Sequence, residues 1–215
     1  MSDKPINVLF LCTHNSARSI LAEAVLNRIG NGRFKAWSAG SSPRANQQPN
    51  PFSLKALEKV GIPTDGLRSK SWDEFGQPDA PPQASTAPSG GSALHEVNSV
   101  GVTANRAGPP QASTAPSGGS ALHKVNSVGV IFDLVITVCD NAANEVCPYW
   151  PGQPATAHWG YPDPSLVDGS DAQKLEAFMN TLHHMKRRME LLVSLPEASV
   201  SKLMLQDAAR GLAKS

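Results

Sequence analysis

Cys12 and Arg18 enclose a short loop, Thr-His-Asn-Ser-Ala, whose length and composition suit the binding of an oxyanion. In such a loop several backbone N–H groups and the arginine fork can converge on one tetrahedral anion. The same positive field is expected to lower the pKa of the Cys12 thiol, because it stabilises the thiolate. A thiolate beside a bound oxyanion is a nucleophile, so the motif predicts covalent attack by Cys12 on the anion.

The segments on either side of the loop decide between this interpretation and a simpler one. Residues 7–11 form an apolar run typical of a buried strand, and residues 19–28 carry apolar side chains at helical spacing. A cysteine at the end of a buried strand is often only a small apolar residue. A loop that joins a strand to a helix N-terminus is, however, a common anion-binding arrangement, which favours a catalytic Cys12.

Alternating strands and helices predict an α/β fold with a parallel sheet. Asn50 is expected to cap a helix over residues 52–60, with Pro51 in its first turn and Gly61 at its end. The strands are expected at residues 7–11, 34–38, 132–138 and 155–158.

The C-terminal part, residues 171–215, is predicted to be helical. A helix over residues 171–194 ends before Pro196, and residues 199–214 form a second amphipathic helix. Seven apolar residues lie along one face of the first of these helices: Leu175, Phe178, Met179, Leu182, Met185, Met189 and Leu192. Such a stripe indicates packing on a core, so we expect residues 1–215 to form a single domain.

Residues 79–130 interrupt this pattern before the third strand. Residues 81–102 recur as residues 109–130 with one change, Glu96 to Lys124. Pro, Ser, Gly and Ala dominate the segment, which is too poor in large apolar residues to build a core. We therefore predict a disordered insertion; the alternative is a short hairpin or an added edge strand.

The overall composition is that of an ordinary globular protein, with 40% hydrophobic residues and a formal net charge of +1. It gives no indication of a nucleic-acid partner. No apolar run is long enough to cross a membrane, and the first residues lack the basic start of a secretory signal. We expect a cytoplasmic protein whose three cysteines stay reduced unless its chemistry uses them.

Three blocks of sequence also resemble a known family. Residues 8–19 resemble the phosphate loop of the low-molecular-weight protein tyrosine phosphatase superfamily, and residues 138–148 and 157–164 are most similar to its arsenate reductase branch. The resemblance implies a flavodoxin-like three-layer fold with a four-stranded parallel sheet in the order 2-1-3-4. In that order Cys12, Cys139 and Asp163 would meet at the carboxyl edge of the sheet.

The resemblance also implies roles for individual residues. Cys12 would be the nucleophile, Arg18 a bidentate clamp on the oxyanion, and Asp163 the general acid that protonates the leaving oxygen. Substrate contacts would come from the loop residues Thr13, His14, Asn15, Ser16, Ala17, Arg18 and Ser19. Of these, Ser19 would also donate to the thiolate, and Asn15 would shape the loop in a left-handed conformation.

Cys139 and Cys147 suggest reduction rather than hydrolysis. In the mechanism that the resemblance implies, Cys139 attacks the Cys12 adduct and Cys147 then attacks Cys139, which leaves a disulfide for thioredoxin or another thiol reductant. Seven residues separate the two cysteines, one more than in thioredoxin-linked members of the family. Two alternatives remain open: a purely structural pair, or a zinc site that includes His158.

Two other functions compete with arsenate reduction. A phosphatase would hydrolyse aryl phosphates through a Cys12 phosphoenzyme, although Ser165 stands where an aromatic residue would grip a phenyl ring. A non-catalytic oxyanion-binding or interaction protein is the third candidate. The resemblance also aligns Glu23, Ser38 and Asp73 with a polar network that holds potassium in the family, but we predict no metal ion and no cofactor here.

Overall fold

The computed structural model describes residues 4–75, 130–143, 150, 153–196 and 202–213, and side-chain surroundings are described from residue 206 onward in the last segment. These residues belong to one compact unit, formed by Met1–Ala80 and Val125–Ser215. The predicted insertion, apart from Val130, lies outside the described residues, and so does Cys147. The expectations for both stay predictions.

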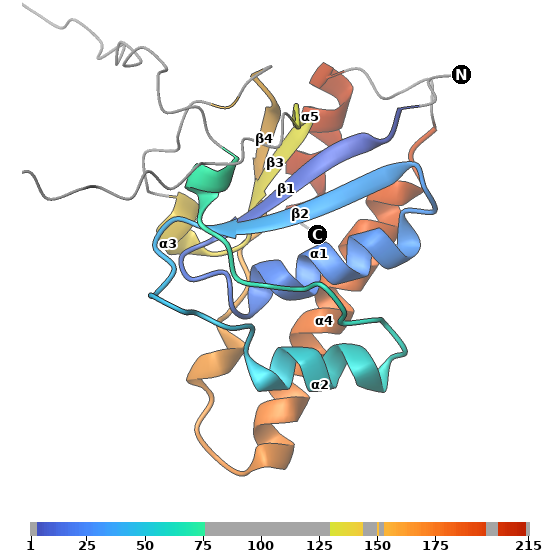
Figure 1. Cartoon of the computed structure of the whole chain (residues 1–215). Helices are drawn as coiled ribbons and strands as arrows, with labels where there is room; N and C mark the ends of the chain where they lie inside the picture. The colour runs from blue at the N-terminus through green and yellow to red at the C-terminus, as the bar shows by residue number, and fades with distance from the viewer. Residues whose placement is uncertain (1–3, 76–129, 144–149, 151–152, 197–201, 214–215) are drawn as a thin grey trace, which may run out of the picture. The chain divides into compact units, whose positions relative to one another are not determined.

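Four parallel strands form the sheet, in the order β2-β1-β3-β4 (Figure 1). They are β1 (Ile6–Cys12), β2 (Phe34–Gly40), β3 (Leu134–Thr137) and β4 (Ala155–His158). The predicted sheet and its strand order are therefore confirmed. Cys12 pairs with Gly40, and Thr137 pairs with both Leu11 and His158. This register brings the carboxyl ends of the strands to one edge.

Strand β3 is shorter than residues 132–138, over which it was predicted. Phe132 precedes the strand and makes edge-on ring contacts with Trp37, Phe75 and Trp150. These aromatic residues, together with the strand residues Leu9, Leu11 and Val135, form the core on one face of the sheet. The apolar run at 132–138 thus contains a strand preceded by a packed aromatic residue. Periodicity alone does not separate the two.

Helices cover the other face of the sheet, where Val8, Phe10, Leu134 and Ile136 point. They are α1 (Arg18–Ile29), α2 (Pro51–Lys59), α4 (Asp171–Val193) and α5 (Lys202–Leu212). A short helix, α3 (Asp140–Ala143), follows β3 directly, and 3-10 turns span Trp72–Glu74 and Pro164–Leu166. Helix α1 packs on β1 and β2 and α5 packs on β4, while α4 packs on α1 and α2 forms an outer layer on α1 and α4.

Local sequence explains where these helices begin. The Asn50 side chain accepts a hydrogen bond from the N–H of Phe52, as predicted, and Ser170 and Gln173 form a reciprocal capping box at the start of α4. The apolar stripe on α4 is confirmed, with its buried members Phe178, Leu182, Met185, Met189 and Leu192. The indole N–H of Trp159 donates to the carbonyl of Ala209 at 2.7 Å, which fixes α5 to the end of β4.

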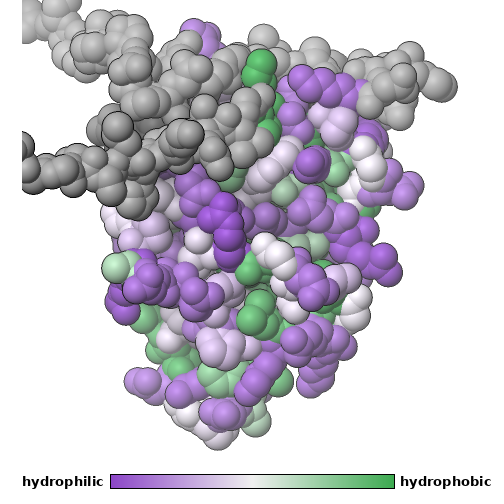
Figure 2. Space-filling view, in the orientation of Figure 1, coloured by the Kyte–Doolittle hydropathy of each residue, from purple (hydrophilic) through white to green (hydrophobic). Residues whose placement is uncertain are grey.

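The surface shown in Figure 2 is mostly hydrophilic where the described residues form it, with hydrophobic residues in small groups. The large hydrophobic residues that are exposed include Leu166, at 78%, and its neighbour Val167, at 37%. Within the described part of the chain, none of the helices combines the length and apolar character needed to cross a membrane.

Candidate active site

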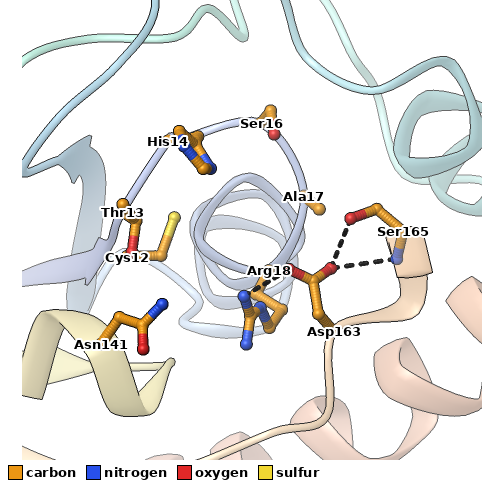
Figure 3. Close-up of a pocket in the computed structure, with 9 residues that line it drawn as sticks. All are labelled: Cys12, Thr13, His14, Ser16, Ala17, Arg18, Asn141, Asp163 and Ser165. Atoms are coloured by element: carbon orange, nitrogen blue, oxygen red, sulfur yellow. Dashed lines mark hydrogen bonds and ion pairs between the residues drawn. The ribbon is translucent and has the colours of Figure 1, made fainter.

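Three chain segments meet at the carboxyl edge of the sheet and surround a pocket of about 70 Å³. The pocket has room for a group the size of a few water molecules, which suits a tetrahedral oxyanion. Figure 3 shows its side chains around the start of α1, with Cys12 and Asn141 on one side and Asp163 and Ser165 on the other. The lining residues are Cys12, Thr13, His14, Ser16, Ala17, Arg18, Asn141, Asp163 and Ser165.

The backbone carbonyl groups at the start of the loop between Cys12 and Arg18 accept hydrogen bonds from residues outside the loop. Donors beyond the loop bind four of them: Ser41 N–H binds the carbonyl of Cys12, Ser42 N–H that of Thr13, Ser69 Oγ that of Asn15, and Asn50 N–H that of Ser16. Across a planar trans peptide the next N–H points the opposite way. The N–H groups of Thr13, His14, Ser16 and Ala17 therefore turn toward the inside of the loop, where an anion would sit.

Two small details allow the loop to take this shape. Asn15 has φ +51°, the left-handed conformation that was predicted for it. Gly40, at the end of β2, lies directly under the loop: an added Cβ would stand 2.7 Å from the carbonyl oxygen of Thr13. A side chain at position 40 would push the loop away from the sheet, so glycine is needed there for close approach.

The start of α1 completes the anion site. Ala17 occupies the N-cap position and provides no side-chain hydrogen bond, and the first turn carries no acidic residue. The N–H groups at this helix end are therefore not satisfied by a capping side chain, and the positive end of the helix dipole faces the pocket. Both features favour an anion in the loop.

Cys12 lies at the bottom of the pocket and is only 4% exposed. Its sulfur is 2.8 Å from Ser19 Oγ and accepts a hydrogen bond from the Asn15 N–H at 3.1 Å. Burial raises the pKa of the Cys12 thiol, while the hydrogen bond with Ser19 acts in the opposite direction. The prediction of a lowered pKa is therefore wrong for this conformation. The reason is burial, which disfavours the charged thiolate more than the hydrogen bonds to the sulfur favour it.

Replacing Ser19 with Ala should make the thiol harder to ionise. The hydroxyl lowers the pKa of Cys12 against the effect of burial, so its loss should move the alkylation profile of Cys12 to higher pH and slow alkylation about tenfold at neutral pH, as expected for one hydrogen bond to a charged group. The measurement is iodoacetamide labelling of the Cys12 peptide, followed by mass spectrometry from pH 6 to 10. Ser53→Ala is the control, because Ser53 touches the loop at the Ser16 carbonyl and not at the sulfur. Equal profiles for Ser19→Ala and the native chain would contradict the prediction.

The guanidinium of Arg18 is engaged on both branches. Nη2 lies 2.6 Å from Asp163 Oδ2, and Nη1 donates to the carbonyl of Tyr161 at 2.9 Å. The other carboxylate oxygen of Asp163 accepts from the N–H and the hydroxyl of Ser165, at 3.0 and 2.6 Å. Arg18 thus contacts the candidate acid directly, while Glu23 pairs with Lys70.

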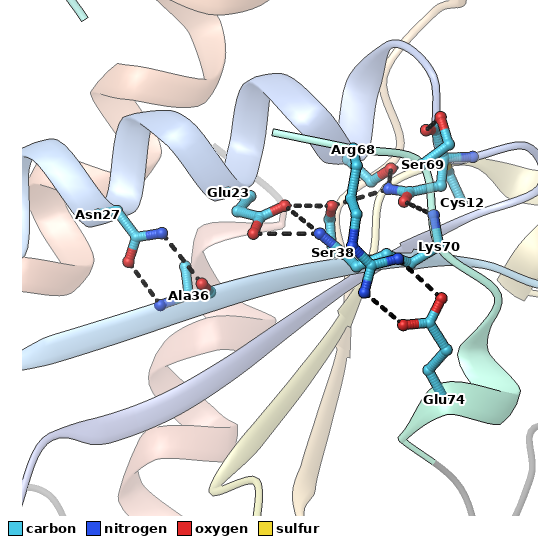
Figure 4. A network of polar contacts seen from close by, with 11 residues as sticks. Cys12, Glu23, Asn27, Ala36, Ser38, Arg68, Ser69, Lys70 and Glu74 are labelled. Carbon is cyan, nitrogen blue, oxygen red and sulfur yellow. Dashed lines mark hydrogen bonds and ion pairs between the residues drawn. The ribbon is translucent and has the colours of Figure 1, made fainter. Parts of the chain in front are cut away.

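A buried polar network supports the loop from behind (Figure 4). The Asn15 amide donates to Ser19 and Ser38 at 2.8 Å each, and the Ser38 hydroxyl donates to Glu23. The Lys70 ammonium lies 3.0 and 3.3 Å from the two carboxylate oxygens of Glu23. All five side chains are buried, so the network holds the loop at fixed positions.

The expected member Asp73 does not join this network, which corrects the alignment made from sequence. Asp73 instead accepts a hydrogen bond from the Ser71 hydroxyl, at 2.7 Å, on the surface. Lys70 supplies the positive charge beside Glu23. Sequence analysis missed Lys70 because lysine is ordinarily an exposed residue.

The second cysteine of the predicted relay follows β3 on the same edge. Cys139 is 2% exposed, and its sulfur lies 3.6 Å from the hydroxyl of Thr13 in the anion loop. Asn141, two residues further on, reaches the pocket, although nothing in the sequence singled it out. The structure therefore brings Cys12, Arg18, Asp163 and Cys139 together, while Cys147 lies outside the described residues.

Comparison with known proteins finds similarity to the family that the sequence blocks resemble. Residues 7–79 match the model of the low molecular weight phosphotyrosine protein phosphatases. Over these residues the chain is similar to the low molecular weight phosphotyrosine protein phosphatases. Among curated proteins it is 24% identical over 183 residues to an arsenate reductase of Halalkalibacterium halodurans, which covers 85% of this chain and 91% of the relative.

Solved structures support the fold assignment. An arsenate reductase from Archaeoglobus fulgidus superposes with a TM-score of 0.50 at 21% identity, covering 87% of this chain and 99% of that one. A low molecular weight protein tyrosine phosphatase from T. tengcongensis gives a TM-score of 0.51 at 17% identity, covering 86% of this chain and 95% of that one. The resemblance predicted from the three sequence blocks is confirmed.

Proposed function

We propose that this protein is an arsenate reductase that uses Cys12, Cys139 and Cys147 as a thiol relay. The observation that carries the proposal is the place of Cys139, buried at the same sheet edge as Cys12 and in contact with Thr13 of the anion loop. Hydrolysis of a phosphate ester needs one thiol and a water molecule, whereas reduction of arsenate needs two electrons from thiols. The curated relatives named arsenate reductase support the same choice.

The first step forms a covalent adduct. Arsenate binds to the inward N–H groups of the loop and to Arg18, and the Cys12 thiolate attacks arsenic. A sulfur–arsenic bond forms, the bond from arsenic to a hydroxyl group of hydrogen arsenate breaks, and one proton from Asp163 converts that leaving hydroxyl to water. A proton on Asp163 also weakens its ion pair with Arg18, so the protonated acid releases the guanidinium to the substrate.

The second step reduces arsenic. The Cys139 thiolate attacks the sulfur of Cys12, the sulfur–arsenic bond breaks, and its electron pair stays on arsenic, which leaves as arsenite. Cys147 then attacks Cys139, which frees the Cys12 thiolate and leaves a Cys139–Cys147 disulfide. Thioredoxin or another dithiol reduces this disulfide. The two electrons that arsenic gains are the two that the thiols lose, and such a cycle fits a reducing compartment such as the cytoplasm.

A phosphatase remains the second candidate, because the anion loop and Asp163 would serve phosphoryl transfer equally well. The family whose model matches residues 7–79 is named for that activity. However, none of the described residues that line the pocket, Ser165 among them, is a Phe, Tyr or Trp whose ring could stack on a phenyl group. This arrangement favours a small free oxyanion over an aryl ester.

The test is arsenite production with thioredoxin, thioredoxin reductase and NADPH. We expect multiple turnovers for the native chain and none for Cys12→Ser, Cys139→Ser or Cys147→Ser. The Cys139→Ser chain should still accept arsenate on Cys12, since the first step does not need Cys139. If the native chain hydrolyses an aryl phosphate but makes no arsenite, and only Cys12→Ser abolishes that hydrolysis, the phosphatase alternative replaces this proposal.

A further inference from the structure

His158, the last residue of β4, joins the ends of two neighbouring segments. Its Nδ1 lies 2.8 Å from the hydroxyl of Thr137, the last residue of β3. Its Nε2 lies 3.1 Å from Oδ1 of Asp140, the first residue of α3. The imidazole therefore links the sheet edge to the start of the helix that follows Cys139.

A neutral imidazole satisfies both contacts. With the proton on Nε2, the ring donates to the Asp140 carboxylate and accepts from the Thr137 hydroxyl at Nδ1. Thr137 is 8% exposed, so one end of the link is anchored in the sheet. The hydrogen bond to a carboxylate is charge-assisted, which makes it stronger than a neutral one.

The link lies at the surface, with the His158 and Asp140 side chains 40% and 85% exposed, but the chain passes close beside it at Gly160. Gly160 lies so close that an added Cβ would stand 3.0 Å from Asp140 Oδ1 and 3.1 Å from His158 Nε2. The chain then continues through Tyr161, whose carbonyl binds Arg18, to Asp163. The link thus lies between the segment that carries the second thiol and the segment that carries the candidate acid.

The residues on either side of Asp140 both belong to the site. Cys139 precedes it, buried beside Thr13, and Asn141 follows it and lines the oxyanion pocket (Figure 3). The described part of α3 is a single turn, Asp140–Ala143, and the hydrogen bonds of one turn do little to fix its start. The position of Asp140 therefore sets the position of both neighbours.

We propose that His158 is a positioning residue: through its hydrogen bond to Asp140 it holds the start of α3, so that Asn141 forms one wall of the oxyanion pocket and Cys139 stays buried beside the anion loop. This inference rests on the proposed function for the role of Cys139 in the relay. The burial of the Cys139 thiol and the binding of an anion in the pocket can both be measured without arsenate.

Two substitutions distinguish the contacts made by the two ring nitrogens of His158. In His158→Asn the shorter amide keeps the contact with Thr137 and loses Asp140, whereas in His158→Gln the amide nitrogen can still reach Asp140. We expect alkylation of Cys139 by iodoacetamide to be about fivefold to tenfold faster in His158→Asn, the effect of one exposed hydrogen bond to a charged group. In the same variant, the dissociation constant of inorganic phosphate, measured by its protection of Cys12 from alkylation, should be severalfold larger.

His158→Gln should stay close to the native chain in both measurements, and so should His183→Asn, a matched change at an exposed histidine on α4. Asp140→Ala removes the same hydrogen bond from the other side and should reproduce His158→Asn, which keeps the test valid if the histidine variant unfolds.

Native-like alkylation and phosphate binding in Asp140→Ala and in a folded His158→Asn would overturn the proposal. A His158→Gln chain that behaves like His158→Asn would also overturn it, because the ring and not the hydrogen bond would then matter. A chain that makes no arsenite but shows these shifts would refute the proposed function alone.

Discussion

Replacing Asp163 with Asn is expected to slow arsenite release by a factor of about 10² to 10⁴, the usual contribution of a general acid. The amide has nearly the same shape and can keep the contact with Ser165, but it has no acidic proton for the leaving oxygen. The same change should tighten the binding of inorganic phosphate, because a neutral amide competes less well than a carboxylate for the guanidinium of Arg18. Slower arsenite release together with tighter phosphate binding would identify Asp163 as the general acid. A disrupted site would instead lose both activity and phosphate binding.

The measurement for Asp163→Asn combines steady-state arsenite production with protection of Cys12 from alkylation by phosphate. Asp168→Asn is the matched control, since Asp168 is an exposed carboxylate five residues further along the chain. A rate for Asp163→Asn within threefold of the native chain would exclude Asp163 as the general acid.

Replacing Lys70 with Met is expected to lower the free energy of unfolding by about 3–5 kcal/mol. The Lys70 and Glu23 side chains are 7% and 11% exposed, so methionine would leave the Glu23 carboxylate buried without its countercharge. The loss should reach the anion loop as well, because Glu23 accepts from Ser38 and the backbone N–H of Lys70 donates to the Asn15 side chain. Phosphate binding should therefore weaken together with stability.

Urea unfolding at pH 7 measures this effect, with Lys59→Met as the control at an exposed lysine on α2. Adding Glu23→Gln to Lys70→Met should restore part of the stability, because the second change removes the unpaired charge. A loss below about 1 kcal/mol for Lys70→Met would show that the ion pair behaves like an exposed one.

Much of the fold could be predicted from local patterns. The apolar runs located all four strands, and the predicted cap at Asn50 lies where helix α2 begins, whereas the cap of α4, Ser170, was found only in the structure. The loop from Cys12 to Arg18 was recognisable because its chemistry depends on residues close together in sequence. The resemblance supplied the strand order, which then placed Cys139 and the Asp163 segment at the same edge.

Other features depend on the packed structure and left little local signal. The raised pKa of Cys12 follows from burial, and burial depends on how β1 and α1 pack in the complete fold. Lys70 pairs with Glu23 across 47 positions of the chain, and its residue type pointed to the surface. Asn141 reaches the pocket only because α3 turns directly after Cys139.

The ion pair between Arg18 and Asp163 has a consequence for substrate choice. The carboxylate is a tethered competitor for the guanidinium, present at a high effective concentration because the Tyr161 carbonyl and Ser165 hold its loop in place. Every incoming oxyanion must displace it, and phosphate and arsenate face the same competitor because their size and charge are so similar. Affinity therefore cannot separate the two anions at this arginine. In the proposed relay, selection between them falls to the step after capture, in which only an arsenic adduct can accept the electron pair that the attack of a second thiol releases.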